Sequence, residues 1–346
     1  MKKVIGISGI NATDNPGPGC GVGRSLIESK LNLELVGISY DVNDPGNYMN
    51  DVFTNSFLMP YPNEGVEVAL KSLEEIKQKS GLDVVIPCLD VELPLMIKNQ
   101  DHLEKIGIKT LLPSIDQFEL RNKEHLTQLS KEIGCLHPHT TTIFNIAELT
   151  NALKDVEFPV IIKGKYYQAF TCYSLENAIL KATEIAASWG FPILLQERIS
   201  GQEVNLIGLA GNDAKVKGRM AIKKQLTTNI GKVWTAVSIK DERLEKICDS
   251  FVANTKWRGP FELEFISNNN GIYLIEINPR FPSWVYFATS LGINLPKMLI
   301  EIVEKGDCAS NFDYPFGKYM VRYSAEFVTD LEQFQNLISY KNRNGL

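Results

Sequence analysis

Residues 261–280 read FELEFISNNNGIYLIEINPR, a sequence in which polar and apolar side chains alternate in two consecutive runs. An alternation with a period of two is typical of strands that have one polar and one apolar face. The polar residues SNNNG at 267–271 separate the two runs and indicate a turn. The stretch therefore predicts an antiparallel hairpin with carboxylates on one face.

The predicted hairpin collects oxygen ligands. Glu264 on the first strand can lie near Glu276 on the second, and two carboxylates this close repel each other unless a cation lies between them. Asn278 adds an amide oxygen, and such ligands suit Mg²⁺, which is shared between carboxylates and substrate phosphates. Arg280, just past the second strand, can bind a phosphate through two parallel hydrogen bonds. The alternative is an amphipathic surface hairpin whose acidic side chains are solvated.

A Glu on the first strand, followed by Glu-x-Asn-Pro-Arg at the end of the second, resembles the metal-binding signature of the ATP-grasp ligases, in the branch of the carbamoyl phosphate synthase large subunit. The resemblance spans most of the chain. It implies that Glu264, Glu276 and Asn278 bind Mg²⁺, with Mn²⁺ as an alternative ion. It also implies a catalytic role for Arg280, which would stabilise the phosphoryl group during transfer.

Length and composition limit the class of protein. A chain of 346 residues is too long for one ordinary hydrophobic core, so two or three domains are expected. A net charge of −5 argues against a nucleic-acid partner, which needs a basic surface. The six cysteines lack CxxC spacing, which indicates reduced thiols in a cytoplasmic enzyme. No apolar run approaches the ~20 residues of a membrane span, so no membrane partner is expected.

The first part of the chain alternates strand and helix patterns. Apolar runs predict strands at 3–8, 33–39, 83–87 and 109–113, and helical patterns lie at 64–79 and 91–105. This order predicts an α/β domain with a parallel sheet and helices on both faces. The glycines of the loop 9–23 do not give the GxGxxG spacing of a dinucleotide-binding turn, and a helix is expected to open at Arg24.

The family resemblance implies a division of the chain. A Rossmann-like domain at 1–115 would precede an ATP-grasp fold of two α+β subdomains, at 116–194 and 195–346, the second with a C-terminal extension. Mg-ATP would bind between these two subdomains.

Two lysines resemble the ATP-binding lysines of the family. Lys123 opens a predicted helix, and Lys163 ends the apolar strand 158–164. The alternative for Lys123 is an exposed helix lysine, and for Lys163 a side chain that extends to solvent past its apolar stem.

The segment 192–206 resembles the hinge of the family. The backbone at Glu197, Arg198 and Ile199 would bind the adenine, and Glu203 would accept hydrogen bonds from the ribose hydroxyls. The alternative for Glu203, an acid on a surface strand, is weaker, because Gly-x-Glu follows the apolar run at the spacing of the family.

The residues after Lys163 depart from the family pattern. ATP-grasp enzymes usually carry a glycine-rich loop there, whose backbone N–H groups cover the phosphates. This chain offers Gly164 alone, followed by the bulky Tyr166 and Tyr167. Side chains could bind the phosphates instead, the loop could serve another substrate, or activity could be reduced.

Six basic residues between 215 and 232 interleave with strand patterns. A solvated face is the usual meaning of such a run. Upstream of a magnesium site it would suit triphosphate or carboxylate binding, and Arg219 and Lys223 are the predicted catalytic residues.

Three other features carry predictions. Asp90 and Glu92 either cap a helix or resemble the stretch that contributes to the acceptor site of the family. Arg24, at a predicted helix start, opposes the helix dipole and is either exposed or binds an anionic acceptor. The stripe Leu331, Phe334, Leu337 and Ile338 near the C-terminus is expected to be core.

The sequence thus predicts an ATP-dependent carboxylate–amine ligase that acts through an acylphosphate. Its substrates would be small-molecule carboxylates and amines, amino acids or peptides among them, and a homodimer is left open. The alternatives are a non-catalytic or regulatory ATP-binding protein of the same fold and a carboxylate–thiol ligase. A biotin-dependent carboxylase component and a nicotinamide dehydrogenase are less favoured.

Overall fold

The computed structural model of the chain describes residues 2–11, 16–164, 168–228 and 231–345. Contacts divide the chain into two compact units. The first consists of Met1–Arg121, Val204–Glu264 and Ile277–Leu346, and the second of Asn122–Glu203 and Phe265–Glu276. The domain boundaries after residues 115 and 194 stay a prediction.

A four-stranded parallel sheet forms the N-terminal part of the first unit. Its order is β3-β2-β1-β4, with β1 at Lys3–Ile7, β2 at Leu33–Ser39, β3 at Asn55–Leu58 and β4 at Val84–Ile86. The predicted α/β class with a parallel sheet is confirmed. The short edge strand β3 was not predicted, and the predicted strand at 109–113 is wrong, because only Lys109 forms an isolated bridge with Val84.

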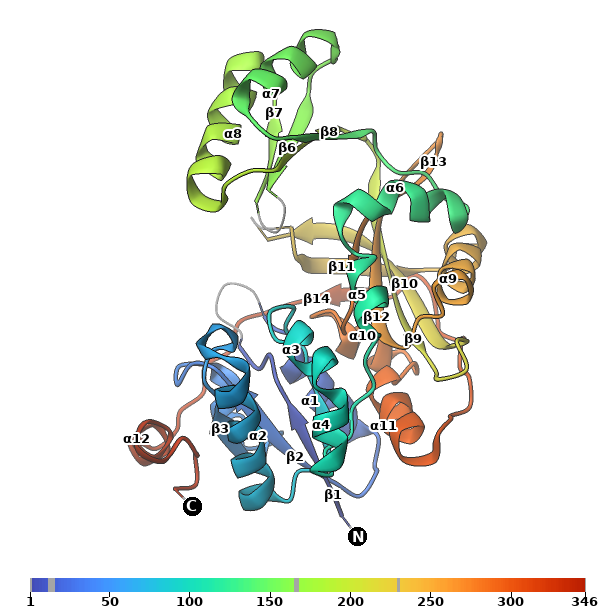
Figure 1. Ribbon diagram of the computed structural model, residues 1–346. Coiled ribbons are helices and arrows are strands. Elements are labelled where there is room, and N and C mark those ends of the chain that lie inside the picture. Colours follow the sequence, from blue (N-terminus) through green and yellow to red (C-terminus); the bar gives the residue numbers. More distant parts are fainter. Residues whose placement is uncertain (1, 12–15, 165–167, 229–230, 346) are drawn as a thin grey trace. The chain divides into compact units, whose positions relative to one another are not determined.

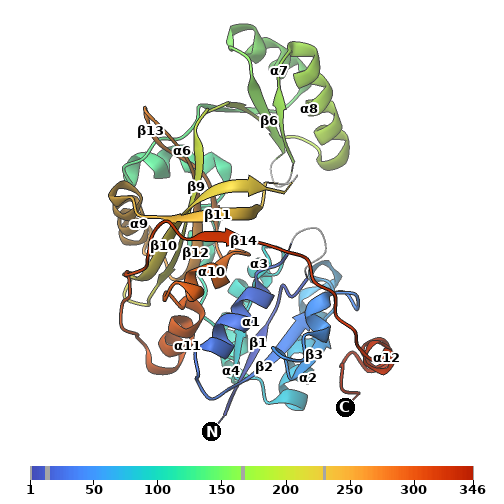
Figure 2. The same ribbon diagram turned by 180° about the vertical axis from the view of Figure 1, so that it is seen from behind.

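Helices cover both faces of this sheet (Figures 1 and 2). Helix α1 (Gly19–Glu28) packs Val22 and Leu26 against one face, and α2 (Val66–Ser80) packs Leu73 and Ile76 against the other. Helix α1 therefore begins five residues before the predicted start at Arg24. The single helix predicted at 91–105 is two helices, α3 (Leu93–Lys98) and α4 (Gln100–Lys105). Three other short helices of the first unit are η1 (Pro45–Tyr48), η2 (Pro62–Glu64) and α5 (Ile115–Glu119), and η3 (Leu153–Asp155) belongs to the second unit.

A six-stranded sheet holds the predicted hairpin. Its order is β13-β12-β9-β10-β11-β14. The strands are β9 (Gln202–Ala210), β10 (Val216–Thr227), β11 (Val233–Ile239), β12 (Gly259–Asn268), β13 (Gly271–Asn278) and β14 (Tyr319–Val321). At the hairpin turn Asn268 accepts hydrogen bonds from the N–H groups of Asn270 and Gly271, and Gly271 has a φ of 150°.

The two faces of this sheet differ. Phe261 of β12 packs on Phe251 of α9 (Glu242–Thr255), with ring centroids 5.2 Å apart. On the opposite face, Met220 of β10 shares a core with Trp284, which precedes α10 (Val285–Ser290), and with Leu295 of α11 (Leu295–Lys305). The acidic side chains of β12 lie on this second face, because they alternate with Phe261 and its apolar neighbours.

The second unit has a sheet of its own. Its order is β5-β8-β6-β7, with antiparallel pairing throughout. The strands are β5 (Thr140–Ile143), β6 (Val160–Gly164), β7 (Ala169–Cys172) and β8 (Ile193–Glu197), and the helices are α6 (Lys123–Glu132), α7 (Ile146–Ala152) and α8 (Leu175–Trp189). Ala182 and Ile185 of α8 pack with Ile162 and Leu149 in its core.

The C-terminal tail crosses the first unit to the edge strand β3 (Figure 2). Helix α12 (Leu331–Tyr340) buries only Leu337 of its predicted stripe, whereas Leu331 is 67% and Ile338 58% exposed. The prediction that this stripe is core is therefore wrong. Past α12, Arg343 is buried and donates to the carbonyls of Asn47 and Phe53 at 2.8 and 2.7 Å.

Across the described ranges, no helix is both long enough and apolar enough to cross a membrane.

Candidate functional site

Two carboxylates of β12 meet at one amide in the first unit. Glu262 and Glu264 lie two residues apart on the same face of the strand. The Asn278 Nδ2 donates to Glu262 Oε2 at 3.0 Å and to Glu264 Oε1 at 2.9 Å. The predicted grouping of Glu264 with Asn278 is thus present in the structure, together with a second carboxylate that the sequence analysis did not assign.

Glu262 is held from three sides. Its Oε1 accepts hydrogen bonds from the Trp284 indole at 2.6 Å and from the Asn205 amide at 2.7 Å. Burial raises the pKa of Glu262, and the charge of Glu264 raises it further. Both carboxylates accept from the Asn278 Nδ2, so the oxygen of that amide faces away from them.

Lys224 neutralises the second carboxylate. Its Nζ donates to Glu264 Oε2 at 2.7 Å. Burial raises the pKa of Glu264, but the charge of Lys224 outweighs it, and the pKa of Glu264 is lowered. The sequence pattern predicted Lys223 instead, the residue directly before it on β10.

The alternation of side chains along β10 explains why Lys224, and not Lys223, reaches Glu264. Lys224 shares a face of β10 with the buried Met220 and Ile222, on the side of the carboxylates. Arg219 and Lys223 lie on the opposite face. There the Arg219 guanidinium forms ion pairs with Asp249 and Glu245 of α9, the latter at 3.1 Å.

The Arg280 guanidinium is bound by Asp90, which lies in the loop after β4. Its Nε and Nη2 donate to Asp90 Oδ2 at 2.9 and 2.8 Å, and Nη2 also donates to Asn278 Oδ1 at 3.1 Å. Arg121 binds the other oxygen of Asp90 at 2.8 Å. Burial raises the pKa of Asp90, but the charges of Arg280 and Arg121 outweigh it and lower the pKa below its ordinary value.

The two acids after β4 have different partners. Asp90 binds the two arginines, whereas Glu92 is buried and accepts hydrogen bonds from the hydroxyls of Ser8 and Tyr40 and from the backbone N–H groups of Cys88 and Leu89. Neither side chain caps the following helix α3. Glu92 therefore stabilises the loop that presents Asp90.

Two more cations lie near Asp90 and Glu262. Burial and the charge of Arg280 lower the pKa of Lys232. Arg322, which follows β14, donates through Nη2 to the carbonyl and hydroxyl of Ser283 at 2.6 and 3.0 Å. The sequence gives no signal for Arg322, since it lies in an exposed segment far from the hairpin.

The predicted acceptor residue Arg24 has a structural partner. Its guanidinium lies 4.0 Å from the centre of the Tyr286 ring, and the Tyr286 hydroxyl binds Glu28 of the same helix. Because α1 begins at Gly19, Arg24 is one and a half turns inside the helix, and the argument from the helix dipole no longer applies.

The second unit brings the two predicted ATP lysines together. Lys123 Nζ donates to the carbonyl of Gly164 at 2.7 Å. Lys163, the residue before Gly164, is buried. Burial and the charge of Lys163 lower the pKa of Lys123 to about 8, against the opposing charge of Glu276. Glu276 itself lies exposed on β13.

The predicted hinge residues lie at the end of β8 and the start of β9. The backbone N–H of Glu197 donates to the carbonyl of His139 at 2.8 Å. Arg198 is exposed and contacts Ser200, and Glu203 is exposed. Ile199 is half-buried. Tyr166 and Tyr167, on which the question of the phosphate-covering loop depends, lie outside the described residues.

No group of three or more His, Cys, Asp or Glu side chains in the described parts of the chain is arranged to hold a metal ion. The oxygens near Asn278 are two carboxylates and one amide. The Asn278 amide turns its Nδ2 toward both carboxylates and its Oδ1 toward Arg280, so these oxygens do not face one common point.

Comparison with known proteins identifies the domain. The family model of the ATP-grasp domain matches residues 123–283. The chain is 21% identical over 219 residues to the carbamoyl phosphate synthase large chain of Clostridium acetobutylicum. The aligned segment covers 59% of this chain and 20% of that protein. With the same protein of Thermotoga neapolitana it shares 23% identity over 81% of this chain and 25% of that protein. The chain thus spans about a fifth to a quarter of the length of these relatives.

Solved structures share the fold. The L-amino acid ligase of Bacillus licheniformis superposes with a TM-score of 0.66 and 17% identity over 88% of this chain and 74% of that one. A second structure is the biotin carboxylase domain of Hydrogenobacter thermophilus 2-oxoglutarate carboxylase, solved with MgADP, ADP and bicarbonate. It superposes with a TM-score of 0.69 and 18% identity over 92% of this chain and 73% of that one. The predicted ATP-grasp fold is confirmed.

Proposed function

We propose that this chain, whose residues 123–283 match the family model of the ATP-grasp domain, is an ATP-dependent ligase that activates a substrate carboxylate as an acylphosphate for attack by an amine. The observation that supports the proposal best is the arrangement of Glu262, Glu264 and Asn278 beside the Arg280 guanidinium. Two carboxylates share one amide there, and Lys224 supplies a positive charge that a divalent ion would replace.

The two carboxylates fit a divalent cation with hard oxygen ligands, and the Asn278 amide would turn its Oδ1 from Arg280 toward that ion. Glu264 and Asn278 would hold Mg²⁺, or Mn²⁺ in its place, and the family pattern adds Glu276. Lys224 neutralises Glu264 when no divalent ion does so. When bound, the ion would offset the charge of the phosphates and polarise the γ-phosphoryl group.

The second unit supplies the proposed nucleotide contacts. Lys123 and Lys163 would bind phosphate oxygens, and the lowered pKa of Lys123 makes an anionic ligand favourable, since it restores the charged form of the amine. The backbone at 197–199 would bind the adenine, and Glu203 the ribose hydroxyls.

The proposed chemistry has two steps. A carboxylate oxygen of the substrate attacks the γ-phosphorus of ATP, the bond to the β-phosphate oxygen breaks, and ADP leaves. The amine nitrogen then attacks the acyl carbon, phosphate leaves with the bonding electron pair, and the nitrogen loses a proton. Arg280 would stabilise the charge on the transferred phosphoryl group, and Asp90 fixes the orientation of its guanidinium.

Release of ADP and phosphate in the presence of paired carboxylates and amines tests this proposal. The ligase of B. licheniformis makes L-amino acids the first panel to measure. Glu264→Gln is expected to lower turnover at least about a hundredfold, because it removes one charge from the cation ligands. Glu75→Gln, an exposed acid on α2, is the matched control and should retain wild-type turnover.

A panel of amino acids and small carboxylates that yields no ADP above the background without substrate would contradict the proposal. Nucleotide binding without turnover would then favour a regulatory ATP-binding protein. One observation favours that alternative, since Asp90, Asn278 and the Phe281 carbonyl already engage the Arg280 guanidinium.

A further inference from the structure

Exposed apolar side chains concentrate near the C-terminus of the first unit. Of the large apolar residues that are exposed in the described part of the chain, ten lie between residues 312 and 340, a segment that holds less than a tenth of the sequence. Tyr323 is 82%, Val328 101% and Leu331 67% exposed. Scattered exposed apolar residues are normal, but a continuous segment of them marks an interaction surface.

Strand β14, in the middle of this segment, has an open edge. It is the last strand in the order of its sheet and pairs with β11 on one side. The Lys318 carbonyl and the Arg322 N–H bind β11 at 2.9 and 3.3 Å, so the backbone groups of Tyr319 and Val321 point to the other side. Among the described strands none pairs with that side.

The protection of this edge is limited to its length of three residues and to the cations Lys318 and Arg322 that flank it. The strand has no proline and no charged residue between 319 and 321, and the exposed side chains of Tyr319 and Val321 are good strand formers. An open edge of this kind accepts another strand.

Both ends of the apolar segment are anchored. At the start, the Tyr314 hydroxyl donates to the carbonyl of Ile239 at 2.7 Å. At the end, Lys341 and Arg343 form backbone hydrogen bonds with Leu58 and Ser56 of β3, each at 2.9 Å. The exposed residues are therefore presented on a fixed backbone path, which lowers the entropic cost of binding.

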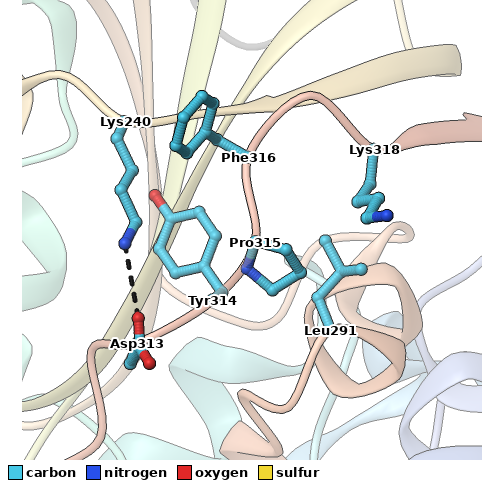
Figure 3. A pocket seen from close by; sticks show the side chains of 7 residues that line it. All are labelled: Lys240, Leu291, Asp313, Tyr314, Pro315, Phe316 and Lys318. Atoms are coloured by element: carbon cyan, nitrogen blue, oxygen red, sulfur yellow. Dashed lines mark hydrogen bonds and ion pairs between the residues drawn. The ribbon is translucent and has the colours of Figure 1, made fainter.

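A surface hollow of about 670 Å³ adjoins the start of β14 (Figure 3). Tyr314, Pro315 and Leu291 line it, and Phe316 projects beside it with 69% of its surface exposed. Lys240 and Asp313 form an ion pair of 3.4 Å at its rim. The hollow offers an apolar floor with a polar edge, which suits an inserted side chain.

We propose that residues 312–340 bind a second copy of this chain, with the two β14 strands paired antiparallel about a twofold axis. Antiparallel pairing of identical strands is self-complementary, so each copy satisfies the open edge of the other. A register that places Val321 opposite Val321 of the partner subunit sets Tyr319 opposite Tyr323 of the partner subunit, and it keeps Arg322 from facing its own symmetry copy.

The available area is sufficient. At about 100 Å² for each half-exposed large side chain, ten of them offer ~1,000 Å² per copy, whereas a standard interface buries ~800 Å² per partner. The charged residues of the segment are two basic and four acidic, so an anionic lipid surface is not the expected partner.

Molar mass measured by light scattering over a concentration series tests the proposal. The wild-type chain is expected to show twice its monomer mass at tens of micromolar. Val321→Lys places a charge at the paired edge, and Leu331→Glu places one on the exposed face of α12. Each should raise the dissociation constant at least about tenfold, and Val68→Lys, at a 49% exposed valine on α2, should leave it unchanged.

Hydrogen exchange gives an independent measurement that does not depend on variants. The amides of Tyr319 and Val321 should exchange more slowly as the wild-type concentration rises. A wild-type monomer throughout the series overturns the proposal. So does a dimer that persists in both Val321→Lys and Leu331→Glu, or exchange at these two amides that is independent of concentration.

Discussion

At the scale of single residues, burial and a neighbouring like charge disfavour the charged form of several ionisable side chains in this protein. Lys123 lies beside Lys163, and Glu262 lies beside Glu264. Such perturbed groups gather at functional sites more often than elsewhere. The residue types at the hairpin could be predicted from the sequence, because Glu264, Asn278 and Arg280 follow a local alternation. Asp90 could not be assigned as the partner of Arg280, because 190 residues separate them.

The lowered pKa of Lys123 predicts a dependence of stability on pH. The folded chain loses the Lys123 proton near pH 8, whereas the unfolded chain keeps it to its ordinary pKa of 10.5. The unfolded state therefore binds more protons between pH 8 and 10.5, and stability rises with pH in that window. Below pH 8 both states are protonated, and this contribution to the free energy of unfolding does not change with pH.

Urea unfolding of wild type and Lys123→Met at pH 7, 8, 9 and 10 measures this effect. The difference between their free energies of unfolding should stay constant up to pH 8 and then move in favour of the wild type. Lys71→Met, at an exposed lysine of α2, is the control. A difference that is flat from pH 7 to 10 would show that Lys123 titrates alike in both states.

At the scale of elements, the parity of β10 decides which lysine serves the site. The strand pattern of residues 216–227 was visible, and its alternation separates two adjacent lysines once the core face is known. The apolar residues Met220 and Ile222 on the core face were the available signal, since Lys224 follows in the same alternation. The break between α3 and α4 had a weaker signal, because Asn99 continues the helical pattern in sequence but not in its backbone angles.

Substitution of the two lysines tests the parity argument. Lys224→Met removes a charge-assisted hydrogen bond of ~1.5–3 kcal/mol from the partly buried Glu264, so ADP formation should fall about tenfold or more. Lys223→Met, on the opposite face, should change it less than about twofold. Turnover rates of both purified variants decide the matter, and an equal loss in the two would restore Lys223 to the site.

At the scale of the whole molecule, the chain does not divide into consecutive domains. The first unit is built from three separate segments, and β9, β12 and β13 each run from one unit into the other. A sequence pattern reports which elements exist, but it does not report which distant segments share a core. The tail was assigned to the core for the same reason, because an amphipathic stripe has the same pattern whether its own chain or another one covers it.

Arg343 predicts how firmly the tail is held. The residue is 3% exposed and donates to two backbone carbonyls, so Arg343→Ala removes both hydrogen bonds and leaves the Asn47 carbonyl with only the long bond of 3.5 Å from the Ser56 hydroxyl, a cost of ~1–3 kcal/mol for a buried group left without its donor. We expect faster hydrogen exchange at Leu58 and a lower free energy of unfolding. Arg243→Ala, which removes an exposed ion pair with Asp241, should cost less than ~1 kcal/mol. Unchanged exchange at Leu58 in Arg343→Ala would mean that the backbone bonds alone hold the tail.

The docking of the tail on β3 also means that one edge of the N-terminal sheet stays unpaired during most of the synthesis of the chain. Strand β3 ends at Leu58, and its outer edge is paired only when Lys341 and Asn342 reach it, 342 − 58 = 284 residues later. At ~5–20 residues per second, a ribosome needs about 15 to 60 s to make that length of chain. Throughout this interval the nascent N-terminal sheet presents an unpaired strand to other chains, so the yield of folded protein should depend on chaperones that shield the sheet until the tail has been made.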